Sequence, residues 1–254
     1  MTEEIKVKAR KKKKRRKKNY VLRFFIFILL IAGTIFAMNL EFFDVSEITV
    51  VNNHYYTAEQ VIGKTDAKTG TNIFFEVKPR DLKEQLLQDA YIKDVDVSRE
   101  FPSTIVINVT ERKEAAAVQY GEAYIVIDEN GLVLRTTDVE PKLPILIGLT
   151  LNEIETGKPL ETEENYMLLD TLTLIEAMNQ SDIYFKRIDL SGVMLKAYIY
   201  DKLVCSGTPE AILKNLRNGG LQKVLYELYN QGVERGTITV SSDGSCAFNA
   251  AIDQ

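Results

Sequence analysis

Few residues of this chain have types and spacing suited to catalysis. Among 254 residues there is one histidine, His54, and there are two cysteines. His54 falls in a predicted turn, and no local motif places a serine or a cysteine beside it, although a general base needs an oriented partner within hydrogen-bonding reach. One histidine and two cysteines also argue against a Cys/His zinc site. We therefore predict no catalytic residue, no metal site and no cofactor.

The carboxylates do not form a catalytic motif either. The sequence contains no calcium-binding loop, no P-loop and no G-x-S-x-G nucleophile elbow. Glu163 and Glu164 are adjacent, but they stand at the start of a predicted helix, where the helix dipole favours negative charge. Because a pair of acids could also hydrolyse a glycan, a membrane-anchored cell-wall enzyme is the alternative from a different functional class.

Cys205 and Cys246 both lie in predicted strands of the second half of the chain. If these strands are neighbours, a compartment outside the cytoplasm would permit a disulfide. Cysteine is also a common small residue of hydrophobic cores. We expect two buried thiols, with the disulfide as the alternative.

Charge is distributed unevenly along the chain. The net charge is −4, yet 11 of the 32 Lys and Arg residues precede Tyr20. Residues 10–18 are all Lys or Arg, and because such a run repels itself we expect residues 1–19 to form a disordered tail. Its simplest role is to fix membrane topology. Attraction to anionic lipid headgroups would accompany that role, and a nucleic-acid patch is the weakest interpretation.

An apolar segment follows the tail. Residues 24–38 carry no charge, and residues 20–40 would span roughly 30 Å as a helix, which matches the hydrocarbon thickness of a bilayer. We predict a transmembrane helix over 20–40, with the basic tail in the cytoplasm and the rest of the chain outside. The alternative is a cleaved signal peptide with Ala37 before the cut, although Ile35 fits the cleavage pattern poorly.

Residues 43–112 carry the signals of a small α+β domain. The predicted strands are 45–51, 92–97 and 104–109, and the predicted helices are 58–62 and 79–88. Thr57 and Gln60 form a capping-box pattern at the start of the first helix, and Pro79 suits the first turn of the second. The order strand, helix, helix, strand, strand predicts a fold of two layers.

Residues 113–254 carry more strand signals than helix signals. The predicted strands are 115–120, 123–127, 132–134, 183–190, 193–200, 203–206, 237–241 and 246–250. Helices are predicted at 161–179, from Pro209 to a break near Asn218, and at 221–229. The first of these helices places Tyr166, Leu169, Leu172 and Ile175 on one face. Since helices must cover one face of the sheet, we predict a mixed α+β domain dominated by antiparallel sheet.

The ordered set of segments resembles a known family. The segments are FFDVSEITVVNN (42–53), TAEQVIG (57–63), GTNIFFEV (70–77) and YIKDVDVSREFPSTIVINVTER (91–112). Together with the preceding anchor they resemble the POTRA domain of the FtsQ/DivIB family of bacterial division proteins, most of all at residues 99–102 and 111–112. Residues 113–254 are similar to the β domain of the same family, with Gly207 before a helix and Gly236 before a strand.

The hairpin near the C-terminus is the most suggestive place for a binding site. Only four residues follow the strand predicted at 246–250, so we expect it to leave an open sheet edge that could accept an incoming strand. The alternative is an ordinary edge blunted by its shortness. The resemblance favours a binding edge, because this part of the family's β domain is implicated in gripping small single-pass partners. The candidate residues are Ala247, Phe248 and Asn249 at the centre, Ile238 and Val240 in support, and Leu221 and Tyr229 on the bordering helix.

The resemblance implies a non-enzymatic scaffold of the bacterial divisome. Its partners would be FtsL-like and FtsB/DivIC-like single-pass proteins and the lipid bilayer, with no nucleic acid and no small-molecule substrate. Its place would be the cell membrane, at the division septum, with the N-terminus cytoplasmic and the domains outside. A chaperone of polypeptide export built on the POTRA domain is a further alternative, because such domains elsewhere receive nascent strands.

Overall fold

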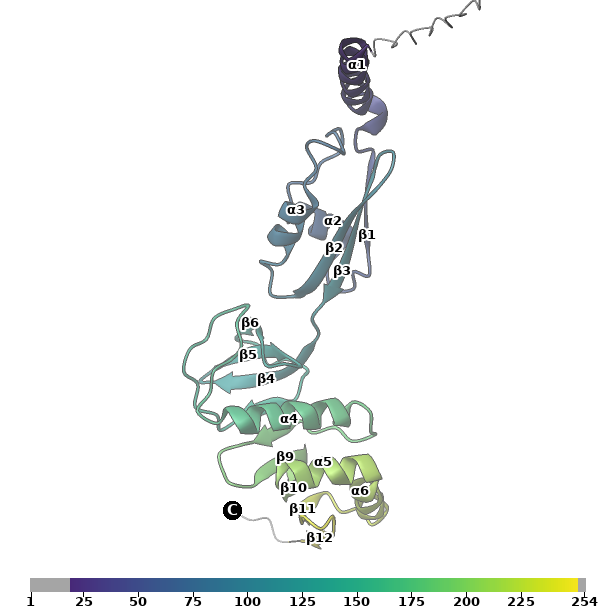
Figure 1. Ribbon diagram of the computed structural model, residues 1–254. Coiled ribbons are helices and arrows are strands. Elements are labelled where there is room, and N and C mark those ends of the chain that lie inside the picture. Colours follow the sequence, from purple (N-terminus) through teal and green to yellow (C-terminus); the bar gives the residue numbers. More distant parts are fainter. Residues whose placement is uncertain (1–18, 251–254) are drawn as a thin grey trace, which may run out of the picture.

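The computed structural model describes residues 19–250. The described chain forms a rod: an apolar helix is followed by two stacked modules, each with its own sheet (Figure 1). We call the part from residue 41 to residue 111 the small module and the part from residue 114 to residue 249 the large module. The basic run at 10–18, for which the sequence predicts disorder, lies outside the described residues.

Helix α1 (Tyr20–Met38) is long and apolar enough to cross a membrane, and none of its residues is buried by the rest of the chain. Its 19 residues extend about 28 Å. Asn39 closes the helix, since its side-chain amide donates to the Ile35 carbonyl oxygen at 2.8 Å. The helix therefore ends two residues before the limit of the predicted span, and a short 3-10 turn, η1 (Glu41–Phe43), leads into the small module.

The small module has the predicted order of strand, helix, helix, strand, strand. Its elements are β1 (Glu47–Val51), α2 (Ala58–Gly63), α3 (Pro79–Leu86), β2 (Ile92–Glu100) and β3 (Thr104–Glu111). The sheet order is β1-β3-β2, with β1 parallel and β2 antiparallel to β3. Both helices cover one face of this sheet (Figure 1), and Leu82, Leu86, Ile105 and Ile107 are buried between the layers.

Local signals account for most of these elements. The Thr57 side chain accepts from the Gln60 amide and the Gln60 side chain accepts from the Thr57 amide, which completes the predicted capping box. The predicted start of the first strand at Val45 is wrong. Val45 pairs with a loop instead, because its amide donates to Thr71 and its carbonyl accepts from Gly70.

The large module is built on one mixed sheet. Its strands are β4 (Glu114–Tyr120), β5 (Ala123–Asp128), β6 (Val133–Thr137), β7 (Ile145–Ile147), β8 (Arg187–Asp189), β9 (Leu195–Tyr200), β10 (Lys202–Gly207), β11 (Arg235–Val240) and β12 (Cys246–Asn249). The sheet order is β12-β11-β10-β9-β8-β7-β4-β5-β6. The pairs β10–β11, β4–β7 and β7–β8 are parallel and the other neighbours are antiparallel. This confirms the predicted α+β class.

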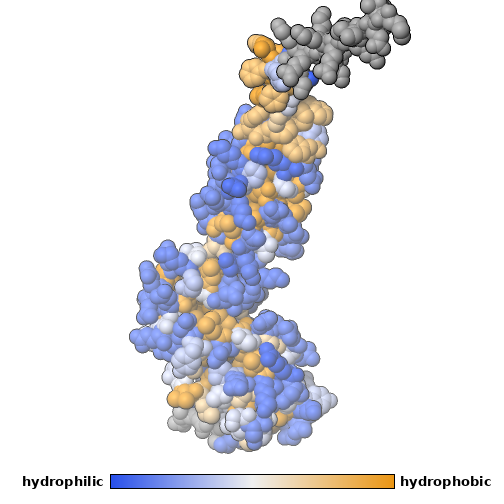
Figure 2. All heavy atoms as spheres, viewed as in Figure 1, coloured by the Kyte–Doolittle hydropathy of each residue, from blue (hydrophilic) through white to orange (hydrophobic). Residues whose placement is uncertain are grey.

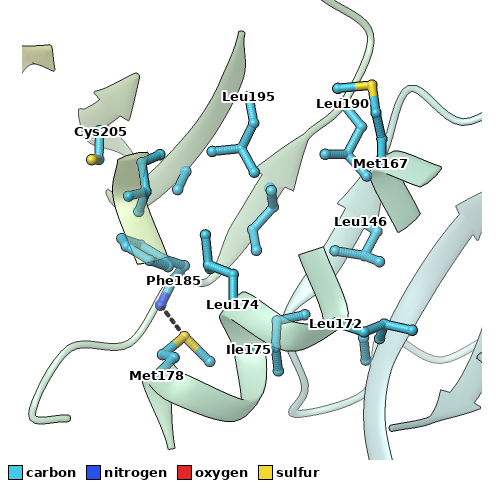
Figure 3. Close-up of a cluster of buried hydrophobic side chains, with 14 of the residues drawn as sticks. Leu146, Met167, Leu172, Leu174, Ile175, Met178, Phe185, Leu190, Leu195 and Cys205 are labelled. Carbon is cyan, nitrogen blue, oxygen red and sulfur yellow. Dashed lines mark hydrogen bonds between the residues drawn. The ribbon is translucent and has the colours of Figure 1, made fainter. Parts of the chain in front are cut away.

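Three helices bury the core of the large module: α4 (Asn165–Met178), α5 (Pro209–Asn218) and α6 (Gly220–Asn230). Thr208 caps α5 by accepting from the Ala211 amide, as the sequence predicts. Gly219, with φ of +74°, separates α5 from α6. Figure 3 shows Leu172, Leu174 and Ile175 of α4 directed toward Leu146 and Leu195 of the sheet, all of them buried.

Helix α4 differs from its prediction in both limits and orientation. Residues 161–164 are not helical, because Thr162 bridges Leu151 and the Glu164 carboxylate accepts from the Thr150 amide at 3.0 Å. Of the residues predicted on the buried face, Leu172 and Ile175 are buried, whereas Tyr166 and Leu169 are exposed. Leu168 lies on the buried face one position before Leu169, so the helix is rotated relative to the predicted pattern.

Two further strands depart from the sequence pattern. The strand predicted at 183–190 shrinks to β8, because Phe185 turns into the core and its amide donates to the Met178 sulfur at 3.0 Å (Figure 3). Strand β7 was not predicted. It consists of three residues held between β4 and β8, so its pairing partners are distant in the sequence.

The two modules meet through charged and aromatic side chains. Glu114 at the start of β4 accepts from the Tyr91 hydroxyl at 2.7 Å and from Arg135 at 2.8 Å. Burial acts to raise the pKa of Glu114, but the hydrogen bonds from Arg135 and Tyr91 outweigh burial and hold this pKa below its usual value. Lys93 of the small module pairs with Glu129 of the large module at 2.9 Å. The rod is thus joined by specific contacts at this point.

Candidate functional site

Strand β12 forms one end of the nine-stranded sheet. Within the described residues 19–250 its only strand partner is β11, and the hairpin between them is the one that Asp243 and Gly244 predict. The Asp243 carboxylate accepts from the Ser245 amide at 2.8 Å, and Gly244 has φ of +91°. β12 therefore offers the backbone groups of its outer side at a sheet edge.

The register places alternate residues of β12 on opposite faces. Phe248 pairs with Ile238 and Cys246 pairs with Val240, so these four side chains share the face that the helices cover. Ile238 and Val240 are buried, whereas Phe248 is 37% exposed. Ala247 pairs with Thr239 on the other face, and both are exposed. Asn249, opposite Thr237, completes the exposed part of the strand.

Gly236 fixes how Phe248 lies. This glycine, near the start of β11, has φ of +134°, a conformation that residues with side chains rarely adopt. A Cβ atom at this position would lie 2.6 Å from the Phe248 ring and 2.6 Å from the Asn249 carbonyl oxygen. The ring and the end of β12 therefore rest directly on the Gly236 backbone, and only glycine leaves room for them.

Two adjoining grooves flank the end of β12. The first, of about 700 Å³, is lined by Phe248 and Ala250 of the terminal segment, by Tyr200, Asp201 and Lys202 of the β9–β10 turn, and by the residues 232–235. The second, of about 740 Å³, runs along α6 past Leu225, Tyr226 and Tyr229. The two share Tyr200, Gly232, Val233 and Glu234. They form a continuous surface beside the open edge, in which the apolar side chains of Tyr200, Val233 and Phe248 alternate with charged residues such as Asp201 and Glu234.

The structure brings most of the predicted site residues together. Ala247, Phe248 and Asn249 form the edge strand, and Ile238 and Val240 lie beside them. On the bordering helix, Tyr229 is 74% exposed and lines the second groove, whereas Leu221 is fully buried in the core and offers no surface.

Part of the groove consists of residues that were not predicted as site residues. These are Tyr200, Val233 and Tyr226. The turn at Asp201 was predicted, so an exposed aromatic residue at Tyr200 was the available signal. The apposition of this turn with the α6–β11 loop depends on the parallel pairing of β10 with β11, which joins distant segments.

The reactive side chains near this edge are arranged for packing. Both cysteines are free, with Cys205 buried and Cys246 half-buried, so the expected burial of both thiols holds only for Cys205. Burial raises the pKa of each thiol and keeps it protonated. The Cys246 sulfur donates to Asn215 Oδ1 at 3.4 Å.

The remaining candidates for chemistry are dispersed. His54 is exposed and its Nδ1 lies 2.9 Å from the Asn52 carbonyl oxygen, in the predicted turn. Across residues 19–250, no group of three or more His, Cys, Asp or Glu side chains could hold a metal ion. The arrangement that remains is an open strand edge beside a groove of aromatic, aliphatic and charged side chains, which is suited to recognition of an extended peptide.

Comparison with known proteins gives consistent matches. A family profile described as "POTRA domain, FtsQ-type" matches residues 43–112. The chain is 27% identical over 216 residues to "Cell division protein DivIB" of Clostridium acetobutylicum, which covers 84% of this chain and 85% of the relative. It is 29% identical over 252 residues to the protein of the same name from Clostridium botulinum (strain Loch Maree), covering 97% and 95%.

A solved structure is also similar. It is the major extracytoplasmic domain of the cell division protein DivIB from Geobacillus stearothermophilus, with 15% sequence identity and a TM-score of 0.29. The match covers 42% of this chain and 87% of that chain.

Proposed function

Since the chain belongs to the FtsQ/DivIB family of bacterial cell-division proteins, we propose that it is a non-enzymatic scaffold of the divisome that binds single-pass partners at the β12 edge. The single observation that carries this proposal is an uncharged sheet edge beside a groove that offers both aromatic and charged side chains. The proposed domains are a cytoplasmic tail (1–19), a membrane span (20–40), a POTRA domain (43–112) and a β domain (113–254).

Orientation follows from charge. The 11 basic residues before Tyr20 favour the cytoplasmic side by the positive-inside rule, so both modules would lie outside the membrane. Helix α1 supplies the span. The family's role in division supports a location at the septum, where the proposed partners would be FtsL-like and FtsB/DivIC-like proteins.

Binding would occur by strand addition. An extended partner segment would pair with the outer backbone of β12, which supplies affinity through main-chain hydrogen bonds. Side chains of the partner would enter the groove beside Phe248 and Tyr200, which supplies specificity. Because partner and scaffold are both confined to the membrane, their effective concentration is high and a modest interface is sufficient.

The test is capture of co-expressed FtsL-like and DivIC-like proteins from the same genome. Phe248→Lys places a charge where the ring contacts the groove, and Ala247→Lys places one on the other face of β12. We expect each variant to lower capture by about tenfold, because a charge left unpaired in an interface costs roughly 1–3 kcal/mol. Ser98→Lys on β2, the exposed edge of the small sheet, is the matched control and should capture normally.

Capture by each variant is compared with its unfolding temperature. If both β12 variants unfold at the wild-type temperature and still capture their partners as well as Ser98→Lys does, strand addition at β12 is wrong. The absence of enzymatic activity is tested separately, by incubating the chain with purified peptidoglycan. Released muropeptides would contradict a pure scaffold.

A further inference from the structure

Five phenylalanines gather at the end of the small module nearest α1. They come from three segments. Phe42 and Phe43 belong to η1, Phe74 and Phe75 to the loop between α2 and α3, and Phe101 to the β2–β3 turn. The Phe74 ring centroid lies 5.1 Å from that of Phe43 and 5.0 Å from that of Phe101. We call these five residues the juxtamembrane aromatic patch.

The outer rings of this patch face away from the protein. Phe42 is 66% exposed, Phe75 is 49% exposed and Phe101 is 59% exposed, while Phe43 and Phe74 are half-buried beneath them. Figure 2 shows apolar surface continuing from the helix onto this end of the small module. Exposed apolar patches of this kind mark surfaces that contact a membrane, another protein or a ligand.

The patch is fixed to the end of the membrane helix by hydrogen bonds. The Asn72 side-chain amide donates to the Met38 carbonyl oxygen at 2.9 Å, which ties the loop that carries Phe74 and Phe75 to the last residue of α1. The Ile73 amide donates to the Phe43 carbonyl oxygen at 3.0 Å. Since Phe42 follows Met38 by only four residues, the rings lie close to the C-terminal end of α1.

The charges beside the rings limit how deeply the patch can enter lipid. Glu41 precedes Phe42, Glu76 follows Phe75 and Glu100 precedes Phe101, and all three carboxylates belong to exposed residues. A carboxylate is costly in hydrocarbon but is tolerated among headgroups. Aromatic residues are enriched at the membrane–water interface, and aromatic rings beside charged groups suit this layer.

We propose that the juxtamembrane aromatic patch lies in the headgroup layer of the leaflet from which the small module emerges. This inference rests on the proposed membrane span of α1 and goes beyond it, because it gives the folded module its own contact with lipid. Helix and module then contact the bilayer at two linked points. The contact holds the module against the membrane and restricts the tilt of the rod.

Fluorescence tests this directly, because the chain contains no tryptophan. We would introduce single tryptophans as Phe75→Trp and Phe101→Trp, which conserve an aromatic ring. Phe27→Trp, within α1, reports on the span, and Tyr226→Trp, an exposed ring on α6 in the large module, reports on solvent. Each full-length variant would be reconstituted in phosphatidylcholine vesicles, once with lipids brominated near the headgroup end of the acyl chain and once with lipids brominated near its methyl end.

We expect Phe75→Trp and Phe101→Trp to be quenched about threefold more than Tyr226→Trp, with blue-shifted emission, as for interfacial tryptophans. If the headgroup-end bromines quench Phe75→Trp and Phe101→Trp no more than Tyr226→Trp, while the methyl-end bromines quench Phe27→Trp strongly, the patch proposal is overturned and the span is left intact; the rings would then be free for a protein partner. A Phe27→Trp that neither lipid quenches would contradict the span itself, and the patch proposal would fall with it.

Discussion

The two sheets of this molecule each end in an exposed strand, and the two edges are protected very differently. β2 of the small module has nine residues, and its exposed positions include Lys93, Asp94, Asp96 and Glu100. β12 of the large module has four residues, and none of them is charged. The longer edge is therefore the more polar one.

Charge, and not length, distinguishes the β2 edge, which we call the closed edge, from the β12 edge, which we call the open edge. An incoming strand on β2 would have to disturb the pairs Lys83–Asp94 at 2.8 Å and Lys93–Glu129 at 2.9 Å. Charged side chains are a common device against unwanted strand pairing. β12 itself carries no charged side chain, and the groove beside it exposes the rings of Phe248 and Tyr200. This difference is why we propose β12, and not β2, as the binding edge.

Of the substitutions that test the difference between the two edges, Gly236→Ala should have the largest effect, and it should act on the β12 edge. The added methyl group would overlap the Phe248 ring and the Asn249 carbonyl oxygen, so β12 must move away from β11. We expect a loss of about 1–3 kcal/mol in the free energy of unfolding of the hairpin. Hydrogen exchange monitored by mass spectrometry should become faster at 246–250 and remain unchanged at 92–100.

The matched control for this variant is Gly63→Ala. Gly63 ends α2, and a Cβ atom there would meet nothing within 4 Å. Exchange rates should therefore stay at wild-type values in both edges. Equal protection of β12 in Gly236→Ala and in the wild type would show that Gly236 does not determine the position of the strand.

A smaller effect should follow from removing charge from β2. The double variant Asp94→Thr, Asp96→Thr leaves the strand in place but makes its exposed edge nearly neutral, and threonine is well suited to strands. We expect self-association, seen as a concentration-dependent rise in sedimentation coefficient of the detergent-solubilised protein. Asp81→Asn, Glu84→Gln on α3 removes the same charge away from the edge, and it should stay monomeric.

The sequence predicted those parts of the molecule whose signals are local. The cap at Thr57, the proline at the start of α3 and the Asp243-Gly244 hairpin each specify an element from a few adjacent residues. The position of β12 at a sheet edge was expected for the same reason, because a terminal hairpin adds its second strand at the outside.

The features that the sequence did not predict depend on contacts between distant segments. β7 is a three-residue strand that exists because β4 and β8 lie on either side of it. In α4, apolar residues occur at consecutive positions, such as Leu168 and Leu169, so periodicity alone cannot decide which one is buried. Gly236 looks like an ordinary glycine before a strand until the Phe248 ring is placed over it.

The smallest expected effect concerns the ion pair at the closed edge. The hydrogen bond from Lys83 is the largest of the causes that lower the pKa of Asp94 below its usual value of 3.8. Because the folded-state pKa is depressed, the contribution of this pair to stability is present above pH 3.8 and is lost as pH falls through the folded-state pKa. Carboxyl-carbon NMR should show Lys83→Gln returning the Asp94 midpoint toward 3.8, and an unchanged midpoint would contradict the pairing.

The order of the modules along the rod also restricts which molecules can reach the open edge. β12 lies at the end farthest from α1, with the small module and the rest of the large sheet between them (Figure 1). If partners dock at β12 as we propose, a partner anchored in the same bilayer needs an exterior segment long enough to extend past both modules before it can pair with this strand. Membrane proteins with short exterior segments would then be excluded whatever their sequence.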